Sequence, residues 1–480
     1  MRGNSLRNVF SAPALTPQRG RRNPPQILSI SPKDIIFASP LVMRESKMSI
    51  IRLSAPATLR GEVELPASKS ISNRVLVMRS LVRGACPPIE NLSDCDDTMV
   101  MRRWLEGDDA YVDVGAAGTA MRFSTALLCV RPGEHVITGS ARMRQRPIGV
   151  LVDALRSLGA DIRYEGEEGY PPMRISLSEE LRVKSEEYCG SEEIKVKSEE
   201  WGRSITLSAG VSSQYISALL MIGPVVEGGL RLQLEGTIVS KPYIDMTVAL
   251  MREWGAAVEW VDAHTLVVAP RPYQPRAFRV ENDWSAASYW YEMVALSTDE
   301  EAQVDLPGLW MPSLQGDARV ADYFAPLGVR TEQEPWGVRL RKGVCRTETY
   351  VLDLVEQPDL AQTLVVTCCM MGVPFRFSGL QSLRIKETDR LTALCTELGK
   401  MGFVVEALDG RVLQWSPSSG AVAPRSDIVI DTYDDHRMAM AFAPCCLRTG
   451  TIAIRDPHVV TKSYPRFWAE LAKVGVNGEW

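Results

Sequence analysis

Apolar residues recur along the chain in an order that predicts a helix, then a glycine, then a strand. The clearest case begins at Pro147, a residue type that suits the first turn of a helix. Gly159 ends the helical pattern, and residues 161–165 then alternate as a half-buried strand should. The apolar stripe on one face of this predicted helix consists of Ile148, Leu151, Val152, Leu155 and Leu158.

The same junction recurs at regular intervals. Five glycines mark it, with spacings of 96, 73, 74 and 73 residues: Gly159, Gly255, Gly328, Gly402 and Gly475. The first interval contains a Glu/Lys/Ser-rich stretch near 179–200, where Val-Lys-Ser-Glu-Glu occurs twice, and removing it as an insertion brings 96 close to 73. Helix–glycine–strand junctions are common by themselves. Their regular spacing nevertheless favours about six repeated α/β units across residues 48–480.

Length and composition bound the class of protein. The chain has 480 residues, of which 45% are hydrophobic and 24% charged, as in a globular protein with a substantial core and two or more domains. Its net charge of -5 provides no electrostatic basis for nucleic-acid binding. No apolar run approaches the roughly 18 residues of a membrane span. We therefore expect a cytoplasmic protein with neither a nucleic-acid partner nor a membrane.

The cysteines and histidines do not predict a metal site. The ten cysteines show no C-x-x-C spacing, and Cys368-Cys369 and Cys445-Cys446 are vicinal pairs inside apolar runs. The four histidines do not lie near a cysteine or another histidine with ligand spacing. Buried free thiols in a reducing compartment are the expected state, without structural zinc.

The first 47 residues differ from the rest of the chain. Up to Lys33 they contain five arginines and no acidic residue. That composition suits a transit peptide, and an over-long gene start explains it equally well. We predict a disordered extension over 1–47 and place the working start at Met48. A plastid location would follow only if 1–47 is a genuine transit peptide.

The most charged short stretch is Arg384-Ile-Lys-Glu-Thr-Asp-Arg390. On an exposed helix such a mixture is usually a set of i,i+4 ion pairs. Here it lies between a strand-like segment at 374–380 and a predicted helix start at 391–399. Charges at such a junction can face a cleft, where a carboxylate beside Lys and Arg suits proton transfer on an anionic substrate.

Several other polar clusters lie where a helix is predicted to begin. Residues 68–74 (Ser-Lys-Ser-Ile-Ser-Asn-Arg) follow a predicted strand at 61–65 and precede a predicted helix at 75–81. Hydroxyls, a lysine, an arginine and helix N–H groups make an anion site there, although the glycines of a Walker loop are absent. Similar clusters are Gly115 to Arg122, Arg142 to Pro147, Ser212 to Gln214, Ser240 to Tyr243, Asp435 to Arg437 before a helix from Met438, and Thr461 to Pro465.

Cations dominate these clusters. An acidic protein that concentrates cations at helix starts is expected to bind a small molecule carrying several negative charges. Asp359, in isolation best explained as a helix N-cap, and Glu387 lie among the cations and could transfer protons. The basic members are Lys69, Arg74, Arg122, Arg146, Lys386, Arg390, Arg437 and Lys462.

These motifs, in their order along the chain, resemble the 5-enolpyruvylshikimate-3-phosphate synthase family. The resemblance covers essentially residues 48–480 and implies an α/β (α+β) protein with the enolpyruvyl transferase fold. That fold has two similar domains, each of three repeated βαβ-type units of packed helices and sheets. The first domain would be discontinuous (48–67 plus 282–480) and the second would span 68–281, with chain crossings near Ala67 and Asn282.

The resemblance also implies the reaction and its residues. The 5-hydroxyl of shikimate 3-phosphate would attack phosphoenolpyruvate, and phosphate would leave. Glu387 would protonate the methylene carbon and later remove that proton, Asp359 would orient or deprotonate the hydroxyl, and Lys69 would neutralise the departing phosphate. Shikimate 3-phosphate would be held by Lys69, Ser70, Arg74, Ser212, Ser213, Gln214, Ser240, Tyr243, Asp359, Ser382 and Lys386. Phosphoenolpyruvate would be held by Lys69, Gly118, Arg146, Gln214, Arg390, Arg437 and Lys462.

No metal or organic cofactor is implied, and the protein is expected to act as a monomer on these small-molecule substrates. Three positions depart from the family pattern: Ala116 and Ser382 stand where Asn is frequent, and Phe123 where Pro is frequent. Ala116 and Ser382 would lie beside ligands, so affinity rather than reaction type is affected.

Two alternative functions share features with this sequence. The sister enzyme that transfers enolpyruvyl to UDP-N-acetylglucosamine has a related fold and a cysteine in the loop before its Arg-Pro. Residues 139–147 contain no cysteine, which argues against that enzyme. A non-catalytic phosphometabolite-binding protein of the same fold would not require both Asp359 and Glu387.

Overall fold

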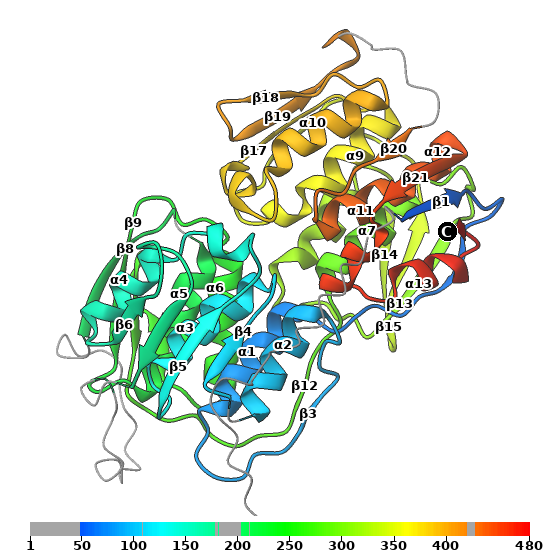
Figure 1. Ribbon diagram of the computed structural model, residues 1–480. Coiled ribbons are helices and arrows are strands. Elements are labelled where there is room, and N and C mark those ends of the chain that lie inside the picture. Colours follow the sequence, from blue (N-terminus) through cyan, green and yellow to red (C-terminus); the bar gives the residue numbers. More distant parts are fainter. Residues whose placement is uncertain (1–48, 108, 178–180, 182–202, 211, 420–427) are drawn as a thin grey trace, which may run out of the picture. The chain divides into compact units, whose positions relative to one another are not determined.

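One sheet topology is used five times in the computed structural model (Figure 1). The structure describes residues 49–107, 109–177, 181, 203–210, 212–419 and 428–480. In each four-stranded sheet of this part of the chain, two parallel strands are followed by two antiparallel neighbours. The predicted repeat of α/β units is therefore confirmed for five of the six expected units in the described part of the chain.

The sheets are, from edge to edge, β4 (Tyr111–Asp113), β5 (Glu134–Thr138), β7 (Met173–Ser176) and β6 (Asp161–Tyr164); β8 (Arg203–Ser208), β9 (Leu230–Glu235), β11 (Thr265–Val268) and β10 (Val258–Trp260); β2 (Arg60–Glu62), β13 (Gln303–Pro307), β15 (Gly337–Lys342) and β14 (Val329–Glu334); β16 (Tyr350–Asp353), β17 (Phe375–Ser378), β19 (Val412–Trp415) and β18 (Glu406–Leu408); and β20 (Val429–Ile430), β21 (Thr451–Arg455), β1 (Ile50–Ser54) and β22 (Asn477–Glu479). A two-stranded parallel sheet joins β3 (Ile89–Glu90) to β12 (Phe278–Arg279).

The five turn glycines of the predicted repeat precede equivalent edge strands, β6, β10, β14, β18 and β22. Their φ angles lie between 84° and 99°, in the left-handed region that other residues adopt at a cost. Glycine at these positions lets the helix stop and the chain turn into the edge strand. The spacing read from the sequence thus reflects one repeated backbone device.

Two groups of three helices form the centre of the fold. In one group α1 (Lys69–Ser80), α3 (Gly118–Leu128) and α5 (Ser213–Ile222) contact one another, and in the other α7 (Trp284–Leu296), α9 (Ala361–Met371) and α11 (His436–Phe442) do so. We call these six the inner helices. Every residue of α3 and of α11 is buried, as expected for helices that are covered on all sides.

The other α-helices of the described chain pack around them and are amphipathic. In α10 (Arg390–Lys400), for example, Leu391, Leu394 and Leu398 are buried at helical spacing. The remaining members are α2 (Asp96–Glu106), α4 (Gly149–Ser157), α6 (Lys241–Glu253), α8 (Val320–Phe324), α12 (Cys446–Thr449) and α13 (Phe467–Lys473).

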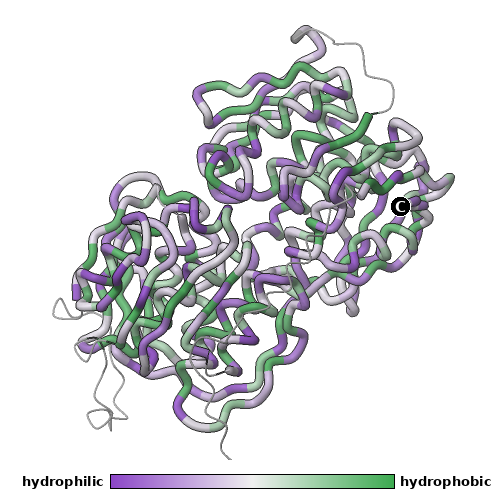
Figure 2. The backbone as a smooth tube through the Cα atoms, in the orientation of Figure 1, coloured by the Kyte–Doolittle hydropathy of each residue, from purple (hydrophilic) through white to green (hydrophobic). Residues whose placement is uncertain are grey.

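The buried apolar side chains form two clusters. One contains residues of 51–65 and 284–476, and the other contains residues of 67–280. Figure 2 shows hydrophobic stretches following the buried helices and strands. Between the clusters, Ala67 and Asn282 form an isolated antiparallel bridge. A division into two domains at these residues stays a prediction, since 48–480 form one compact unit.

Several predicted boundaries were wrong by part of a turn or more. Ser68 accepts a hydrogen bond from the N–H of Ile71 and caps α1, so the helix begins at Lys69 rather than at Val75. Asp435 likewise caps α11, which begins at His436 rather than Met438. The polar motifs therefore form first helical turns instead of preceding them.

Three further expectations concern Asp359, the segments near 1–47 and 179–200, and membrane-spanning helices. Asp359 does not cap α9, because it lies in the 3-10 turn Pro358–Leu360 before it. The extension at 1–47 and most of the predicted insertion near 179–200 lie outside the described residues. Within the described ranges no helix combines the length and hydrophobicity needed to cross a membrane.

Candidate active site

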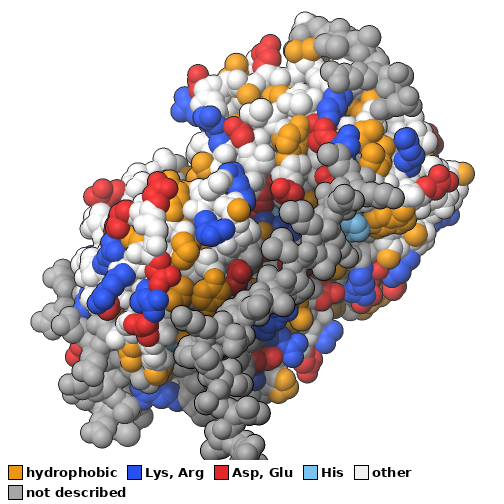
Figure 3. Space-filling view, in the orientation of Figure 1, with side chains coloured by type: hydrophobic (Ala, Val, Ile, Leu, Met, Phe, Trp, Pro, Cys, Tyr) orange, Lys and Arg blue, Asp and Glu red, His pale blue; other side chains and the backbone are white. Residues whose placement is uncertain are grey.

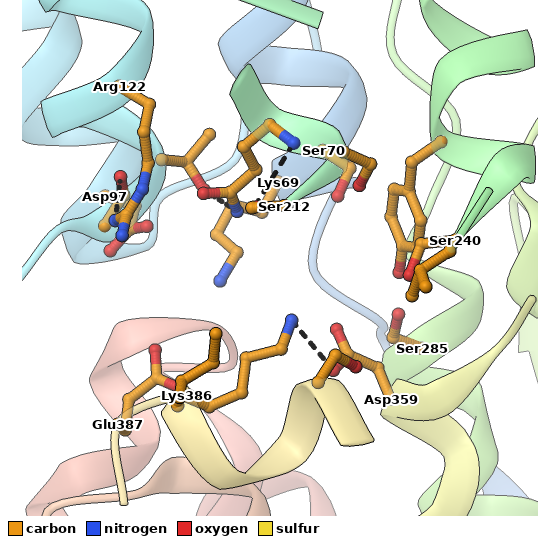
Figure 4. A pocket seen from close by; sticks show the side chains of 18 of the residues that line it. Lys69, Ser70, Asp97, Arg122, Ser212, Ser240, Ser285, Asp359, Lys386 and Glu387 are labelled. Atoms are coloured by element: carbon orange, nitrogen blue, oxygen red, sulfur yellow. Dashed lines mark hydrogen bonds and ion pairs between the residues drawn. The ribbon is translucent and has the colours of Figure 1, made fainter. Parts of the chain in front are cut away.

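The inner helices direct their N-termini to one cavity of about 420 Å³. Each contributes lining residues from its first turn, its N-cap or the turn just before it. The positive ends of six helix dipoles therefore face the same space, which favours an anionic ligand. Figure 4 shows Lys386 extending toward Asp359, with Ser70 and Ser212 across the opening.

The cavity brings together nearly all the residues that the sequence singled out. Those that line it are Lys69, Ser70, Arg74, Gly118, Arg146, Ser212, Ser213, Gln214, Ser240, Tyr243, Asp359, Ser382, Lys386, Glu387, Arg390 and Arg437. Lys462 is not a lining residue, but its Nζ lies 2.6 Å from Oε1 of Glu387. The ligand assigned to each residue stays a prediction.

Arg390 lies at the centre of what we call the carboxylate side of the cavity, formed by Asp359, Glu387 and Asp435 with their cationic partners. The Arg390 side chain is 2% exposed. Its Nε donates to Asp435 at 2.6 Å, its Nη1 to Asp359 at 3.0 Å and its Nη2 to Glu387 at 3.0 Å. Burial lowers the pKa of Arg390, but the three carboxylates raise it by more. The guanidinium is thus fixed by charge on three sides.

Asp359 has two further cationic partners. Arg437 donates through Nη2 to its Oδ2 at 3.2 Å and through Nη1 to its backbone carbonyl at 3.0 Å. The Nζ of Lys386 lies 3.6 Å from its Oδ1. Burial alone would raise the pKa of Asp359, but the surrounding cations hold it far below its usual range. Asp359 is therefore ionised and can accept a hydrogen bond from a ligand hydroxyl.

Glu387 is held in the same way. Lys462 donates to its Oε1 at 2.6 Å, and Nη1 of Arg146 lies 3.9 Å from the same oxygen. Burial would raise the pKa of Glu387, but Lys462, Arg390 and Arg146 lower it well below its usual range. In this arrangement Glu387 is an ionised carboxylate. It can hold a proton only if those cations are drawn toward another anion.

The opposite wall, which we call the hydroxyl side, comprises Ser70, Ser212, Ser213 and Ser240 with the cations among them. Its buried Arg74 has neutral partners only: Oγ1 of Thr247 at 2.7 Å, Oγ of Ser217 at 3.2 Å, and the carbonyls of Ser70 at 2.9 Å and Tyr243 at 3.2 Å. Burial lowers the pKa of Arg74 to about 10. Phe123, at a position where the family often has Pro, lies under this guanidinium, with Cζ 5.4 Å from the ring centroid.

Gly118 allows two more guanidinium groups to approach the start of α3. A Cβ at this position would lie 2.9 Å from Nη1 of Arg122 and 2.9 Å from Nη1 of Arg146. Arg122 also donates to the carbonyl of Gly118 at 2.8 Å. The Nε of Arg146 is buried without a hydrogen-bond partner, and burial lowers the pKa of this side chain. A larger residue at 118 would therefore force both guanidinium groups to shift.

Lys69 is the first residue of α1, and both anionic groups (Asp97 and Glu387) and a cation (Arg437) act on its ammonium. Its backbone N–H donates to Oδ2 of Asp283 at 3.2 Å. Burial lowers the pKa of Lys69, but Asp97 and Glu387, among nearby anionic groups, raise it by more. The ammonium therefore stays charged inside the cavity. Asp97 itself is buried, and its Oδ1 has no hydrogen-bond partner.

Sequence reasoning missed several lining residues, among them Asp97, Asp283, Ser285 and Tyr289. It also missed Asp317, whose Oδ2 accepts hydrogen bonds from Tyr243 at 3.1 Å and from Ser285. Burial raises the pKa of Asp317 to about 6. Asp283 caps α7, so applying the rule of polar clusters to every helix start would have found Asp283 and Ser285.

The positions that depart from the family pattern have different surroundings. Ser382 lines the cavity, and its Oγ is buried without a hydrogen-bond partner. Ala116 is exposed in the turn before α3 and is not among the lining residues. Of the two, only Ser382 is placed to meet a ligand directly in this arrangement.

The charges of the lining residues determine what the cavity can bind. Seven Lys and Arg side chains face it, against four Asp and Glu side chains. The excess positive charge and the helix N-termini suit a compact polyanion with phosphate and carboxylate groups. Among the residues that the structure describes, no group of three His, Cys, Asp or Glu side chains could hold a metal ion. The expectation of a reaction without metal or cofactor stays a prediction.

Comparison with known proteins gives a consistent result. The family model described as EPSP synthase (3-phosphoshikimate 1-carboxyvinyltransferase) matches residues 53–107, 100–184 and 177–471. A 3-phosphoshikimate 1-carboxyvinyltransferase of Bacteroides fragilis (strain YCH46) is 50% identical over 423 residues, which cover 88% of this chain and 97% of the relative. One of Marinomonas sp. (strain MWYL1) is 34% identical over 452 residues, covering 88% and 98%.

Solved structures show the same fold at lower identity. The EPSP synthase of Acinetobacter baumannii has a TM-score of 0.68 at 19% identity and covers 90% of this chain and 100% of its own. The enolpyruvyl transferase NikO of Streptomyces tendae has a TM-score of 0.62 at 16% identity, covering 90% and 98%. The predicted enolpyruvyl transferase fold is confirmed.

Proposed function

This chain belongs to the EPSP synthase family of 3-phosphoshikimate 1-carboxyvinyltransferases, and from that premise we propose that its cavity carries out the family's reaction. The enolpyruvyl group of phosphoenolpyruvate passes to the 5-hydroxyl of shikimate 3-phosphate, and phosphate is released. The observation that carries the proposal is the pair of ionised carboxylates, Asp359 and Glu387, inside a cavity with an excess of cations. Binding a polyanion needs the cations, whereas transferring protons needs the carboxylates.

We assign the hydroxyl side to shikimate 3-phosphate. Arg74 is a buried cation with neutral partners only, so an incoming phosphate does not have to displace a carboxylate from it. Ser70, Ser212 and Ser213 offer hydroxyls at two helix starts. The unpartnered Oγ of Ser382 is available to a ligand hydroxyl or phosphate oxygen. Asp359 then lies where it can accept the proton of the attacking 5-hydroxyl.

Phosphoenolpyruvate is assigned to the cations around Glu387. Its carboxylate and phosphate would share Arg146, Arg390 and Lys462 with that side chain. Sharing these cations weakens the effect that lowers the pKa of Glu387, so substrate binding itself moves Glu387 toward protonation. Glu387 could then give its proton to the methylene carbon while the oxygen–carbon bond forms.

The second half of the reaction reverses the proton transfer. Glu387 takes a proton back from the methyl group, the double bond re-forms, and the bond to the phosphate oxygen breaks. Lys69 keeps its charge in the cavity and would neutralise the departing phosphate. No step requires a metal or an organic cofactor.

We further propose a cytoplasmic monomer built from two domains, 48–67 with 282–480 and 68–281, that does not bind nucleic acid. Cations and anions are interspersed on the visible part of the face in Figure 3, as on a surface without a polyanion-binding patch. The two apolar clusters and the Ala67–Asn282 bridge support the domain boundaries.

Phosphate release tests the function directly. With phosphoenolpyruvate and shikimate 3-phosphate together the protein should release phosphate, and with either substrate alone it should not. A third reaction replaces shikimate 3-phosphate by UDP-N-acetylglucosamine and should give no release. Release in that reaction would identify the sister enzyme, and none in any reaction would indicate a binding protein.

A further inference from the structure

The loop that delivers Asp435, His436 and Arg437 to the cavity contains an unusual backbone turn. Tyr433 and Asp434 both have φ of 55°, and the N–H of Asp435 donates to the carbonyl of Thr432 at 2.8 Å. Two consecutive left-handed residues closed by such a bond form a turn that strongly prefers Asn and Gly. A bulky tyrosine is a poor choice for it. The turn must therefore be held in place by its surroundings.

Glu397, two turns into α10, contacts the turn from the protein interior. Its side chain is fully buried. Oε1 accepts a hydrogen bond from the hydroxyl of Tyr433 at 2.5 Å, and Oε2 accepts one from the backbone N–H of Asp431 at 3.0 Å. One carboxylate thus binds the chain immediately before the turn and the tip of the side chain within it.

Lys400 and Arg455 complete the attachment. The Nζ of Lys400 donates to Oε2 of Glu397 at 2.6 Å, to Oδ2 of Asp431 at 2.7 Å and to the carbonyl of Val429 at 3.1 Å. Arg455 donates to Oδ1 of Asp431 at 2.6 Å. The buried charge of Glu397 is therefore compensated by a cation that also binds the loop.

The same helix holds the other end of the loop. Arg390, the first residue of α10, donates twice to the carboxylate of Asp435, at 2.6 and 3.2 Å. Asp435 in turn accepts the N–H of Arg437 at 2.9 Å and caps α11. Between these two attachments lie the two left-handed residues (α10, β20 and α11 in Figure 1).

We propose that Glu397 is a positioning residue for the reaction: by binding Tyr433 and the Asp431 backbone, it holds the left-handed turn that places Asp435 against Arg390 and Arg437 against Asp359. Its link to phosphoenolpyruvate rests on the proposed function. We call these two hydrogen bonds of Glu397 the clamp. Without them, Tyr433 and Asp434 would relax toward ordinary φ values. Arg437 and Asp435 would then move, while the hydroxyl side would not.

The test compares Glu397→Gln with the parent and with an exposed control, Glu300→Gln. Glutamine cannot pair ionically with Lys400, so we expect KM for phosphoenolpyruvate to rise about ten-fold, the effect of one lost hydrogen bond to a charged group. KM for shikimate 3-phosphate should stay within about three-fold of the parent value, a change too small for the loss of a hydrogen bond to a charged group. Amide hydrogen exchange over residues 431–437 should become faster. Tyr433→Phe, which removes one hydrogen bond and keeps the buried charge, should shift both readouts in the same direction by less.

The decisive variant adds Asp434→Gly to Glu397→Gln. Asp434 is exposed, and glycine adopts positive φ without strain, so the double variant should recover most of the lost phosphoenolpyruvate affinity and exchange protection. No recovery would overturn the proposal, because Glu397 would then act through packing of α10 rather than through the turn. Equal KM increases for both substrates would also overturn it. If the parent protein releases no phosphate, the proposed function fails, whereas the exchange measurements still decide whether the clamp exists.

Discussion

Two buried arginines on opposite walls of the cavity have opposite pKa shifts. Arg390 is surrounded by three carboxylates, and its pKa is raised despite burial. Arg74 donates only to hydroxyls and carbonyls, and burial lowers its pKa to about 10. Burial is similar in the two cases. The sign of the shift follows from whether the partners carry charge.

The buried Asp317 and the largely buried Asp359 show the same contrast. Cations surround Asp359 and hold its pKa far below the usual range, although burial alone would raise it. Asp317 accepts hydrogen bonds from Tyr243 and Ser285, and burial raises its pKa to about 6. The carboxylate side is therefore neutralised from within, and a ligand must compete with protein carboxylates there. On the hydroxyl side the charge of Arg74 is left for a ligand to neutralise.

A matched pair of substitutions tests this difference most strongly. Arg390→Met leaves the buried Asp435 and the largely buried Asp359 and Glu387 short of a cation, and should lower the free energy of unfolding by about 3–5 kcal/mol. Arg74→Met removes a cation whose burial is uncompensated and should cost no more than about 1–2 kcal/mol, the scale of its hydrogen bonds. Urea denaturation without substrates measures both. Equal losses would show that the two walls do not differ as described.

Glu387→Gln tests the chemistry of the carboxylate side. Glutamine keeps the size and polarity of the side chain but cannot give or take the proton. We expect kcat to fall by about 10²-fold or more, the usual scale for loss of a general acid–base group. KM for shikimate 3-phosphate should change little, because that ligand is assigned to the other wall. Steady-state phosphate release gives both numbers, and a rise in KM with kcat intact would make Glu387 a binding residue.

The raised pKa of Asp317 predicts that the free energy of unfolding depends on pH. A carboxyl whose pKa is higher in the folded protein keeps its proton more tightly there, so this contribution favours folding at low pH. It is lost as pH rises from about 4 to about 6. Asp317→Asn stays neutral throughout, so its stability relative to the parent should increase over that range by about 2–3 kcal/mol. Thermal denaturation from pH 4 to pH 8 measures the difference, and parallel curves would contradict it.

The sequence predicted the parts of this site that depend on local pattern. Turn glycines, apolar stripes and polar clusters at helix starts are short-range signals, and they pointed to Lys69, Arg390 and Arg437, which line the cavity. Asp317 was missed because its role depends on Tyr243, 74 residues away, which no local pattern reveals. The neutral surroundings of Arg74 were missed for the same reason, since Thr247 lies 173 residues from it. Helix starts were misplaced where a capping side chain extended the helix backward, as at Ser68.

The smallest expected effect concerns Ala116, where the family frequently has Asn. An Asn amide beside phosphoenolpyruvate could donate one hydrogen bond, and a direct bond to a charged group would be worth about 1.5–3 kcal/mol. Ala116, however, is exposed and outside the set of lining residues, and its turn is fixed by a hydrogen bond from the N–H of Ser140 to the carbonyl of Gly115 at 2.9 Å.

A new amide at this position would therefore reach the ligand only from the rim of the cavity, where water competes for the same hydrogen bond. We expect Ala116→Asn to lower the Kd of phosphoenolpyruvate, and of glyphosate as its mimic, by a few-fold rather than ten-fold. The kcat should stay within a few-fold of the parent value. Titration of both ligands against the variant and the parent checks this, and Ala116→Ser, which has a shorter polar group, serves as the control. Unchanged or weaker binding of both ligands to Ala116→Asn would show that the rim is shaped around alanine. The affinity of the site for phosphoenolpyruvate would then be determined by the cations of the carboxylate side.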